Sequence, residues 1–195
     1  ESRNFASAFI FYANGFKLDP RDLAIHDEAL KLASEYHRQA GTPATSKQIK
    51  QIDGSTVVDH FIASLFAWWH DVANPKLAIK CINNGVKADQ NDFGAAMADT
   101  ILSLSQQGDK ILSAKELKNL MELFKSTGAW NQAIKVGQAA LEVDRSDSAL
   151  EKSLNELAAE RAMAEGGYND AVTEEGGFRK FIKNFGDQQD LEDDE

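Results

Sequence analysis

The chain has 195 residues, of which 43% are hydrophobic, and it carries a formal net charge of −10 at pH 7. This length allows one domain with a sizeable core, and the lone Cys81 excludes an intramolecular disulfide framework. The acidic balance argues against a nucleic-acid partner, which needs a basic surface, and the lack of a run of about 18 apolar residues argues against a membrane span.

Hydrophobic periodicity predicts helices along most of the chain. The first helix runs from about Asn4 to Lys17 and ends at the Asp19-Pro20 turn, and the second covers residues 21–38. Residues 41–56 are polar, so we expect a connection or insertion there, with at most one short helix. Further helices are predicted over 56–74, 76–87, 92–106, 113–126, 130–143 and 147–165.

Two details of these helices can be predicted from residue type. Ser113 and Glu116 are spaced as a capping box, in which each side chain accepts a hydrogen bond from the backbone N–H of the other residue. Cys81 lies between Lys80 and Ile82 on a predicted helix, where a small buried hydrophobic residue is the usual role of a lone cysteine.

The C-terminal end combines an aromatic segment with an acidic tail. The segment GFRKFIKNF places Phe178, Phe181, Ile182 and Phe185 at helical spacing. A helix this short is marginal alone, so we expect it to dock, either as a cap over the last helix pair or on another subunit. The last nine residues, 187–195, hold six acidic groups and no basic one, which predicts a disordered tail.

One spaced pattern recurs three times, with an alanine, a residue four later, a small residue seven later and a turn at twelve. Its copies are Ala8, Tyr12, Gly15 and Pro20; Ala78, Ile82, Gly85 and Gln90; and Ala133, Gly137, Ala140 and Arg145. Offsets of four and seven lie on one helix face, and a small residue there lets a second helix approach closely. Repeated packing of this kind is typical of an α-solenoid.

These residues resemble tetratricopeptide repeats (TPR). In residues 114–145 the matching core positions are Leu117, Leu120, Phe124, Gly128, Ala133 and Ala140, and in residues 59–90 they are Ile62, Leu65, Trp69, Ala78 and Gly85. Gln90 and Arg145 depart from the family's closing proline, and Gly137 departs from its large aromatic residue. Asn4 to Pro20 resembles the second helix of a repeat without its first, which we interpret as a piece of a longer protein.

The resemblance implies an all-α, right-handed α-solenoid of antiparallel helix pairs over residues 1–186, with a short C-terminal capping helix before the acidic tail. The C-terminal portion is similar to the end of a group of bacterial TPR proteins without assigned function. In TPR domains the first helix of each pair lines a concave groove that holds a peptide. Carried onto residues 58–71 and 113–126, the groove residues would be His60, Ala63, Ala67, His70, Lys115, Lys118, Asn119, Glu122 and Lys125.

The lysines at 115, 118 and 125 lie on one helix face and would attract an acidic peptide, although an ordinary solvated face has the same pattern. His60 and His70 are about 15 Å apart along a helix, too far to share a metal ion, so we expect them to be solvated or hydrogen-bonded. Trp68 would anchor an interface if it is exposed and would otherwise pack in the core.

We therefore expect a protein- or peptide-binding scaffold module that is not an enzyme and needs no cofactor or metal. The partner would be a protein or peptide, with no nucleic acid and no membrane. The alternative is a structural assembly module that self-associates, as a homo-oligomer, through Trp68 and the C-terminal aromatic segment. The sequence leaves the compartment open and slightly favours a cytoplasmic location.

Overall fold

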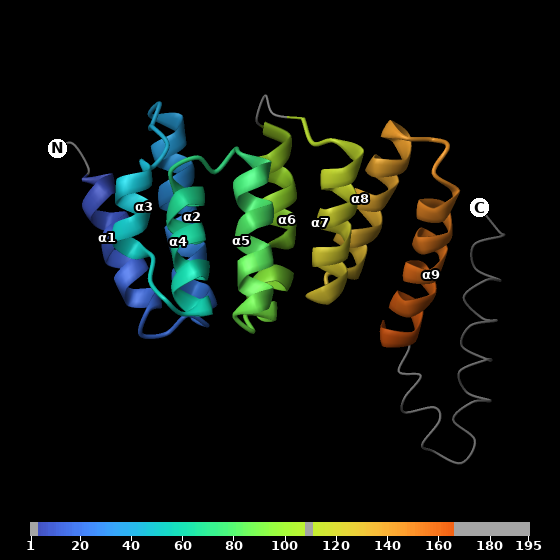
Figure 1. Ribbon diagram of the computed structural model, residues 1–195, viewed down its shortest axis with the longest axis horizontal. Coiled ribbons are helices and arrows are strands. Elements are labelled where there is room, and N and C mark those ends of the chain that lie inside the picture. The colour runs from blue at the N-terminus through green and yellow to red at the C-terminus, as the bar shows by residue number, and fades with distance from the viewer. Residues whose placement is uncertain (1–3, 108–110, 166–195) are drawn as a thin grey trace, which may run out of the picture. The chain divides into compact units, whose positions relative to one another are not determined.

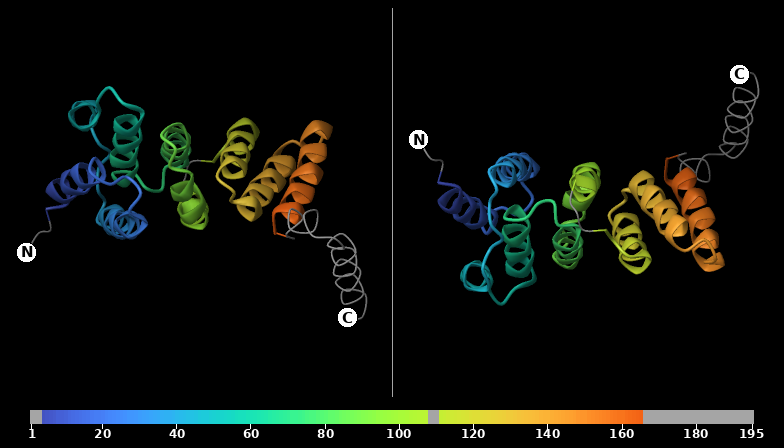
Figure 2. Two further views of the ribbon diagram at one scale, coloured as in Figure 1. Left: turned by 90° about the horizontal axis from the view of Figure 1, so that it is seen from below. Right: turned by 90° about the horizontal axis from the view of Figure 1, so that it is seen from above.

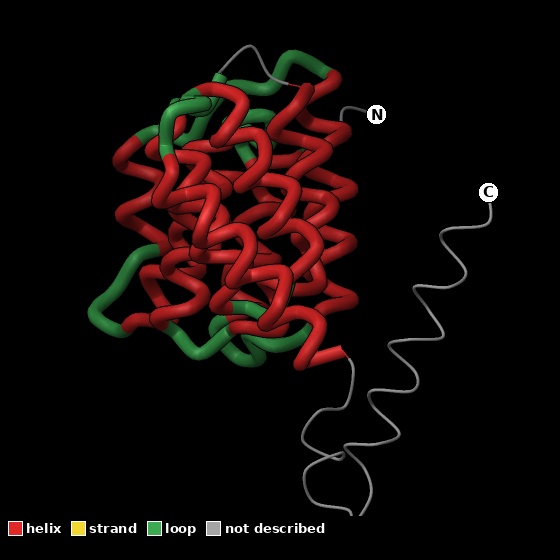
Figure 3. The backbone as a smooth tube through the Cα atoms, turned by 90° about the vertical axis from the view of Figure 1, so that its right-hand side faces the viewer, coloured by secondary structure: helices red, strands yellow, loops and turns green. Residues whose placement is uncertain are grey.

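The computed structural model describes residues 4–107 and 111–165, and all regular structure in this part of the chain is α-helical (Figure 1). Its helices are α1 (Phe5–Phe16), α2 (Leu23–Arg38), α3 (Ser46–Ile52), α4 (Val57–Trp69), α5 (Pro75–Lys87), α6 (Asn91–Gln107), α7 (Ala114–Ser126), α8 (Trp130–Val143) and α9 (Ser148–Glu165). Loops and turns join them (Figure 3). These bounds confirm the predicted helices to within a few residues. The aromatic segment at 178–185 and the tail at 187–195 lie outside the described residues.

Side-chain caps fix where several helices begin. The predicted capping box of Ser113 and Glu116 is present at the start of α7. Two further capping boxes, which the sequence analysis did not name, join Thr45 with Gln48 before α3 and Thr56 with Asp59 before α4. A cap of this kind contributes about 1 kcal/mol. The two caps therefore define where α3 and α4 begin, and so hold the corner between these helices at the end of the polar connection at 41–56.

The chain divides into two compact units, residues 1–146 with α1 to α8 and residues 147–195 with α9. Within the first unit most consecutive helices pack on one another, except that α2 packs on α4 and not on α3, and further contacts join α1 to α4, α5 to α7 and α6 to α8. Figure 2 shows α4, α5 and α7 in one row, with α6 and α8 along one side of it.

The core of the first unit is centred on α4, where every residue from Phe61 to His70 is buried. Such a helix is apolar nearly all round because α1, α2, α3 and α5 all pack against it. Trp69 packs on the rings of Phe9 and Phe16. Trp68 is fully buried, and its indole N–H donates to the carbonyl of Val72 at 3.1 Å. The core alternative for Trp68 is therefore confirmed, and the exposure that the interface alternative required is absent.

The recurring pattern differs between its copies. In the second copy Ala78, Ile82 and Gly85 are buried, and a Cβ atom on Gly85 would lie 3.2 Å from the ring of Phe61 on α4. The three corresponding residues of the third copy on α8 are buried as well. In the first copy a Cβ atom on Gly15 would meet nothing within 4 Å. The small residue therefore lies in a packed interface in two copies and on an open face in one.

Candidate functional site

A hollow of about 220 Å³ lies where α3, α4 and α5 meet. It is lined by Ile49 and Asp53 at the end of α3, by Val57, His60, Ala63 and Ser64 on α4, and by Lys80, Asn84 and Lys87 on α5. His60 and Ala63 are thus the two members of the predicted partner-binding set that line this hollow.

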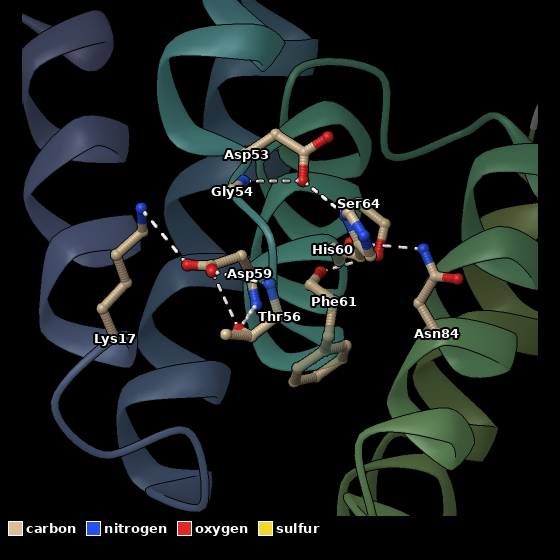
Figure 4. Close-up of polar contacts among 9 residues, drawn as sticks. All are labelled: Lys17, Asp53, Gly54, Thr56, Asp59, His60, Phe61, Ser64 and Asn84. Carbon is tan, nitrogen blue, oxygen red and sulfur yellow. Dashed lines mark hydrogen bonds and ion pairs between the residues drawn. The ribbon is translucent and has the colours of Figure 1, made fainter.

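The corner between α3 and α4 is held by hydrogen bonds around Asp59 (Figure 4). One carboxylate oxygen of Asp59 accepts from the hydroxyl of Thr56 at 2.8 Å and from its backbone N–H at 3.1 Å. These bonds lower the pKa of Asp59, and Lys17, the residue after α1, adds to the effect from 3.6 Å away. A Cβ atom on Gly54 would come within 2.5 Å of the same oxygen. Because Gly54 has no side chain, the backbone between α3 and α4 can pass close to the Asp59 carboxylate.

One turn into α4, the imidazole of His60 meets the carboxylate of Asp53, with 2.7 Å between Nδ1 and Oδ1 (Figure 4). The same Asp53 oxygen accepts the backbone N–H of Gly54 at 3.0 Å, which holds the carboxylate in place. A carboxylate at Nδ1 orients the imidazole ring and favours the tautomer with its proton on that nitrogen. His60 is half exposed, so an oriented ring lies at the edge of the hollow.

The third wall belongs to α5, where Lys80, Asn84 and Lys87 follow one another at helical spacing. The side-chain amide of Asn84 donates to the carbonyl of His60 at 3.2 Å and so joins α5 to α4. Both lysines are exposed. Since Asp53 already contacts His60, the hollow offers two ammonium groups beside one engaged carboxylate. Such an arrangement attracts anionic groups such as carboxylates.

The hydroxyl and thiol near this hollow are poorly placed for nucleophilic chemistry. The hydroxyl of Ser64 is buried and donates to the carbonyl of Phe61 at 2.6 Å. Burial raises the pKa of the Cys81 thiol, which confirms its expected structural role, since the thiolate is the reactive form. Across the described ranges, no group of three or more His, Cys, Asp and Glu side chains could hold a metal ion.

The α7 residues of the predicted set lie apart from the hollow. Lys115, Asn119 and Glu122 are exposed, whereas Lys118 and Lys125 are half-buried. Their helix packs on α5, α6 and α8. An ion pair of 2.9 Å joins Lys76 on α5 to Glu116 on α7. The contact with Lys76, together with hydrogen bonds from Ser113, lowers the pKa of Glu116 to about 2.

The remaining α4 residues of the predicted set point into the core. Ala67 and His70 are buried, and Nδ1 of His70 lies 2.8 Å from the carbonyl oxygen of Phe66. Burial lowers the pKa of His70, so the hydrogen-bonded role expected for it is confirmed. Of the predicted residues at 58–71, His60 is therefore the one with an exposed side chain, and α5 lies between α4 and α7 in the row (Figure 1).

Comparison with known proteins adds no relative: no protein-family model matches the chain, and no curated protein matches it either. The fold defines the class as an all-helical protein whose described residues form nine helices packed in sequential pairs. None of the helices in residues 4–107 and 111–165 has both the length and the apolar character required to cross a membrane.

Proposed function

We propose that this chain is a TPR-like α-solenoid that binds an acidic segment of a protein or peptide and performs no catalysis. The observation that carries the proposal is the pair Lys80 and Lys87 beside His60 in an open hollow. No carboxylate in residues 4–107 and 111–165 forms an ion pair with either lysine. A ligand carboxylate would therefore gain charge-assisted hydrogen bonds there without displacing an existing ion pair.

The lysines of α7 would extend this site along the row of helices. Lys115 is exposed on α7, which packs on the same α5 that carries Lys80 and Lys87. An extended peptide with several acidic residues would place one carboxylate in the hollow and others toward α7. Lys118 and Lys125 would supply further positive charge along that path.

A titration of labelled peptides tests the proposal. A glutamate-rich peptide of about ten residues should bind, and a peptide with glutamine in place of glutamate should not. The double variant Lys80→Glu/Lys87→Glu should weaken binding by at least about tenfold, since two favourable charge contacts become repulsive. The variant Lys135→Glu/Lys152→Glu changes the net charge equally but uses exposed lysines of α8 and α9. Equal binding by both double variants would place the peptide elsewhere, and no binding by the unaltered chain would refute the proposal.

The alternative of a self-associating assembly module loses one of its two contacts, because Trp68 is fully buried. Its second contact, the segment Phe178–Phe185, lies outside the described residues.

A further inference from the structure

Two buried histidines join α1 and α2 to the rest of the first unit. His26 lies on α2 and is 1% exposed, and His70, which follows α4, is 5% exposed. Phe16 of α1 stacks on the ring of His26, and Phe9 of α1 contacts the ring of His70. These two phenylalanines are seven residues apart, which places them on the same face of the helix. One face of α1 therefore contacts both imidazoles.

The surroundings of His26 leave no place for a second proton. Phe61 of α4 and Phe93 of α6 contact the ring from two further helices, with centroids 6.0 Å and 4.7 Å away. Its Nε2–H donates to the carbonyl of Pro20, and its Nδ1 has no hydrogen-bond partner among the described residues. A second proton would bind at Nδ1, and a buried charge without a partner is costly. A protonated ring must therefore reach water, which requires α2 to move.

The charged groups near His26 do not offset this cost. Helix α1 carries none from Phe5 to Phe16. On α4 and α6 the carboxylates next to the contacting rings in the sequence are Asp59, which belongs to a capping box, and Asp92, which is exposed. Burial lowers the pKa of His26 to about 4, and the carboxylate of Asp22, which caps α2, opposes this shift only in part. The folded protein therefore keeps the ring uncharged at neutral pH.

The surroundings of His70 are similar. Phe66 of α4 and Tyr36 of α2 contact its ring, with centroids 4.5 Å and 5.7 Å away. The hydroxyl of Tyr36 donates to a backbone carbonyl after α2, and the neighbouring carboxylate of Asp71 accepts from the amide of Asn74. Burial lowers the pKa of His70, although the Phe66 carbonyl opposes this shift. Acid would therefore place a charge at both imidazoles that contact α1.

We propose that α1 and α2 form an acid-sensitive pair, which separates from the rest of the first unit when the two histidines bind protons, while α7 and α8 stay folded. Helix α2 packs chiefly on α1 and α4, and α7 and α8 pack on one another and on α5 and α6. Opening at α1 and α2 therefore breaks fewer contacts than complete unfolding and needs less free energy. Lys17, after α1, pairs with Asp59, and Arg21, before α2, pairs with Asp89. These ion pairs are partly or largely exposed and oppose the opening only weakly.

Hydrogen–deuterium exchange of the full chain, read by mass spectrometry, tests this proposal. Rates are divided by the intrinsic exchange rate at each pH, so that they report the opening of each helix. A pKa of about 4 in place of the ordinary 6.5 makes any opening that exposes His26 about 20-fold more populated at pH 5 than at pH 7. Amides of α1 and α2 should therefore exchange about 20-fold faster at pH 5. They should also exchange at least about tenfold faster than those of α7 and α8 and respond less to added urea, because a local opening exposes less surface.

Two variants on the same helix assign the effect to His26. His26→Phe cannot bind the proton and should lose most of the acceleration at α1 and α2. The control His37→Gln removes an exposed histidine of α2 and should keep it. The comparison of α1 and α2 with α7 and α8 in the unaltered chain needs no variant. Equal protection and equal urea dependence of all four helices would overturn the proposal, as would an acceleration that is absent from the unaltered chain or that survives His26→Phe.

Discussion

The imidazole of His26 lies on the ring of Phe16, with centroids 4.0 Å apart and planes inclined by 21°. His26 is buried, and Phe93 packs on it as well, with centroids 4.7 Å apart. Its Nε2 lies 3.1 Å from the carbonyl oxygen of Pro20, and its Nδ1 has no hydrogen-bond partner. Burial lowers the pKa of His26 to about 4, although the Pro20 carbonyl opposes this shift. The ring is therefore uncharged at neutral pH.

This lowered pKa predicts that the protein loses stability in mild acid. Between pH 6.5 and pH 4 the unfolded chain binds a proton at His26 that the folded chain does not, so the free energy of unfolding falls as pH falls. The loss between pH 7 and pH 5 should be about 2 kcal/mol from this residue alone. The pKa of His70 is lowered in the same direction. Urea unfolding at the two pH values measures the effect.

The variant His26→Phe provides the control for this prediction. A phenyl ring keeps the contact with Phe16 but cannot bind a proton, so the pH dependence between 7 and 5 should become smaller. The comparison uses the slope with pH and not the absolute stability, which the lost bond to Pro20 also changes. An unaltered slope would show that His26 is not the source.

The ion pair between Lys76 and Glu116 predicts an unusual carboxyl titration on α7. The pKa of Glu116 should be about 2 in the unaltered chain, because Lys76 and the Ser113 cap both favour the charged carboxylate. In Lys76→Ala the pKa should rise toward its ordinary value but stay below it, since the Ser113 bonds remain. Carbon-13 NMR titration of the glutamate side chains measures both values. An identical pKa in the two proteins would mean that α5 and α7 are not joined by this contact in solution.

The glycines at 54 and 15 should respond in opposite ways to alanine. Gly54→Ala would push a methyl group against Asp59 and weaken the capping box of α4, at a cost of about 1 kcal/mol. Gly15→Ala adds a methyl group where nothing lies within 4 Å, and alanine favours a helix over glycine by up to about 1 kcal/mol. Urea unfolding should place the two variants on opposite sides of the unaltered chain. If both variants changed the free energy of unfolding in the same direction, the close approach of Gly54 to Asp59 would be contradicted.

The helices could be predicted from the sequence because their signals are local. The apolar spacing of α4 and the Ser113 cap of α7 each lie within one element. The hollow could not be predicted in the same way, because Asp53, His60 and Lys80 come together only through the packing of three helices. The polar spacing of Lys80, Asn84 and Lys87 on α5 was the available signal. It was passed over because the resemblance placed the groove on the first helix of each pair, at 58–71 and 113–126, and α5 is the second helix of its pair. For Trp68 the sequence left both alternatives open, since burial depends on the neighbours of α4.

The contact between α6 and α7 can be tested through Gly94 and Thr127. A Cβ atom on Gly94 would clash with the Thr127 methyl group, and Thr127 is buried at the end of α7. Gly94→Ala should therefore cost about 1 to 3 kcal/mol through overpacking. Thr127→Ser removes that methyl group but keeps the hydroxyl that donates to the Phe124 carbonyl at 3.0 Å.

The double variant Gly94→Ala/Thr127→Ser distinguishes overpacking from a general loss of stability. It should unfold at higher urea concentration than Gly94→Ala alone, because the new methyl group occupies the space that the threonine methyl group leaves. The coupling between the two substitutions should be at least about 0.5 kcal/mol and favourable, as expected for residues in direct contact. Additive effects would mean that α6 and α7 do not approach each other at this point.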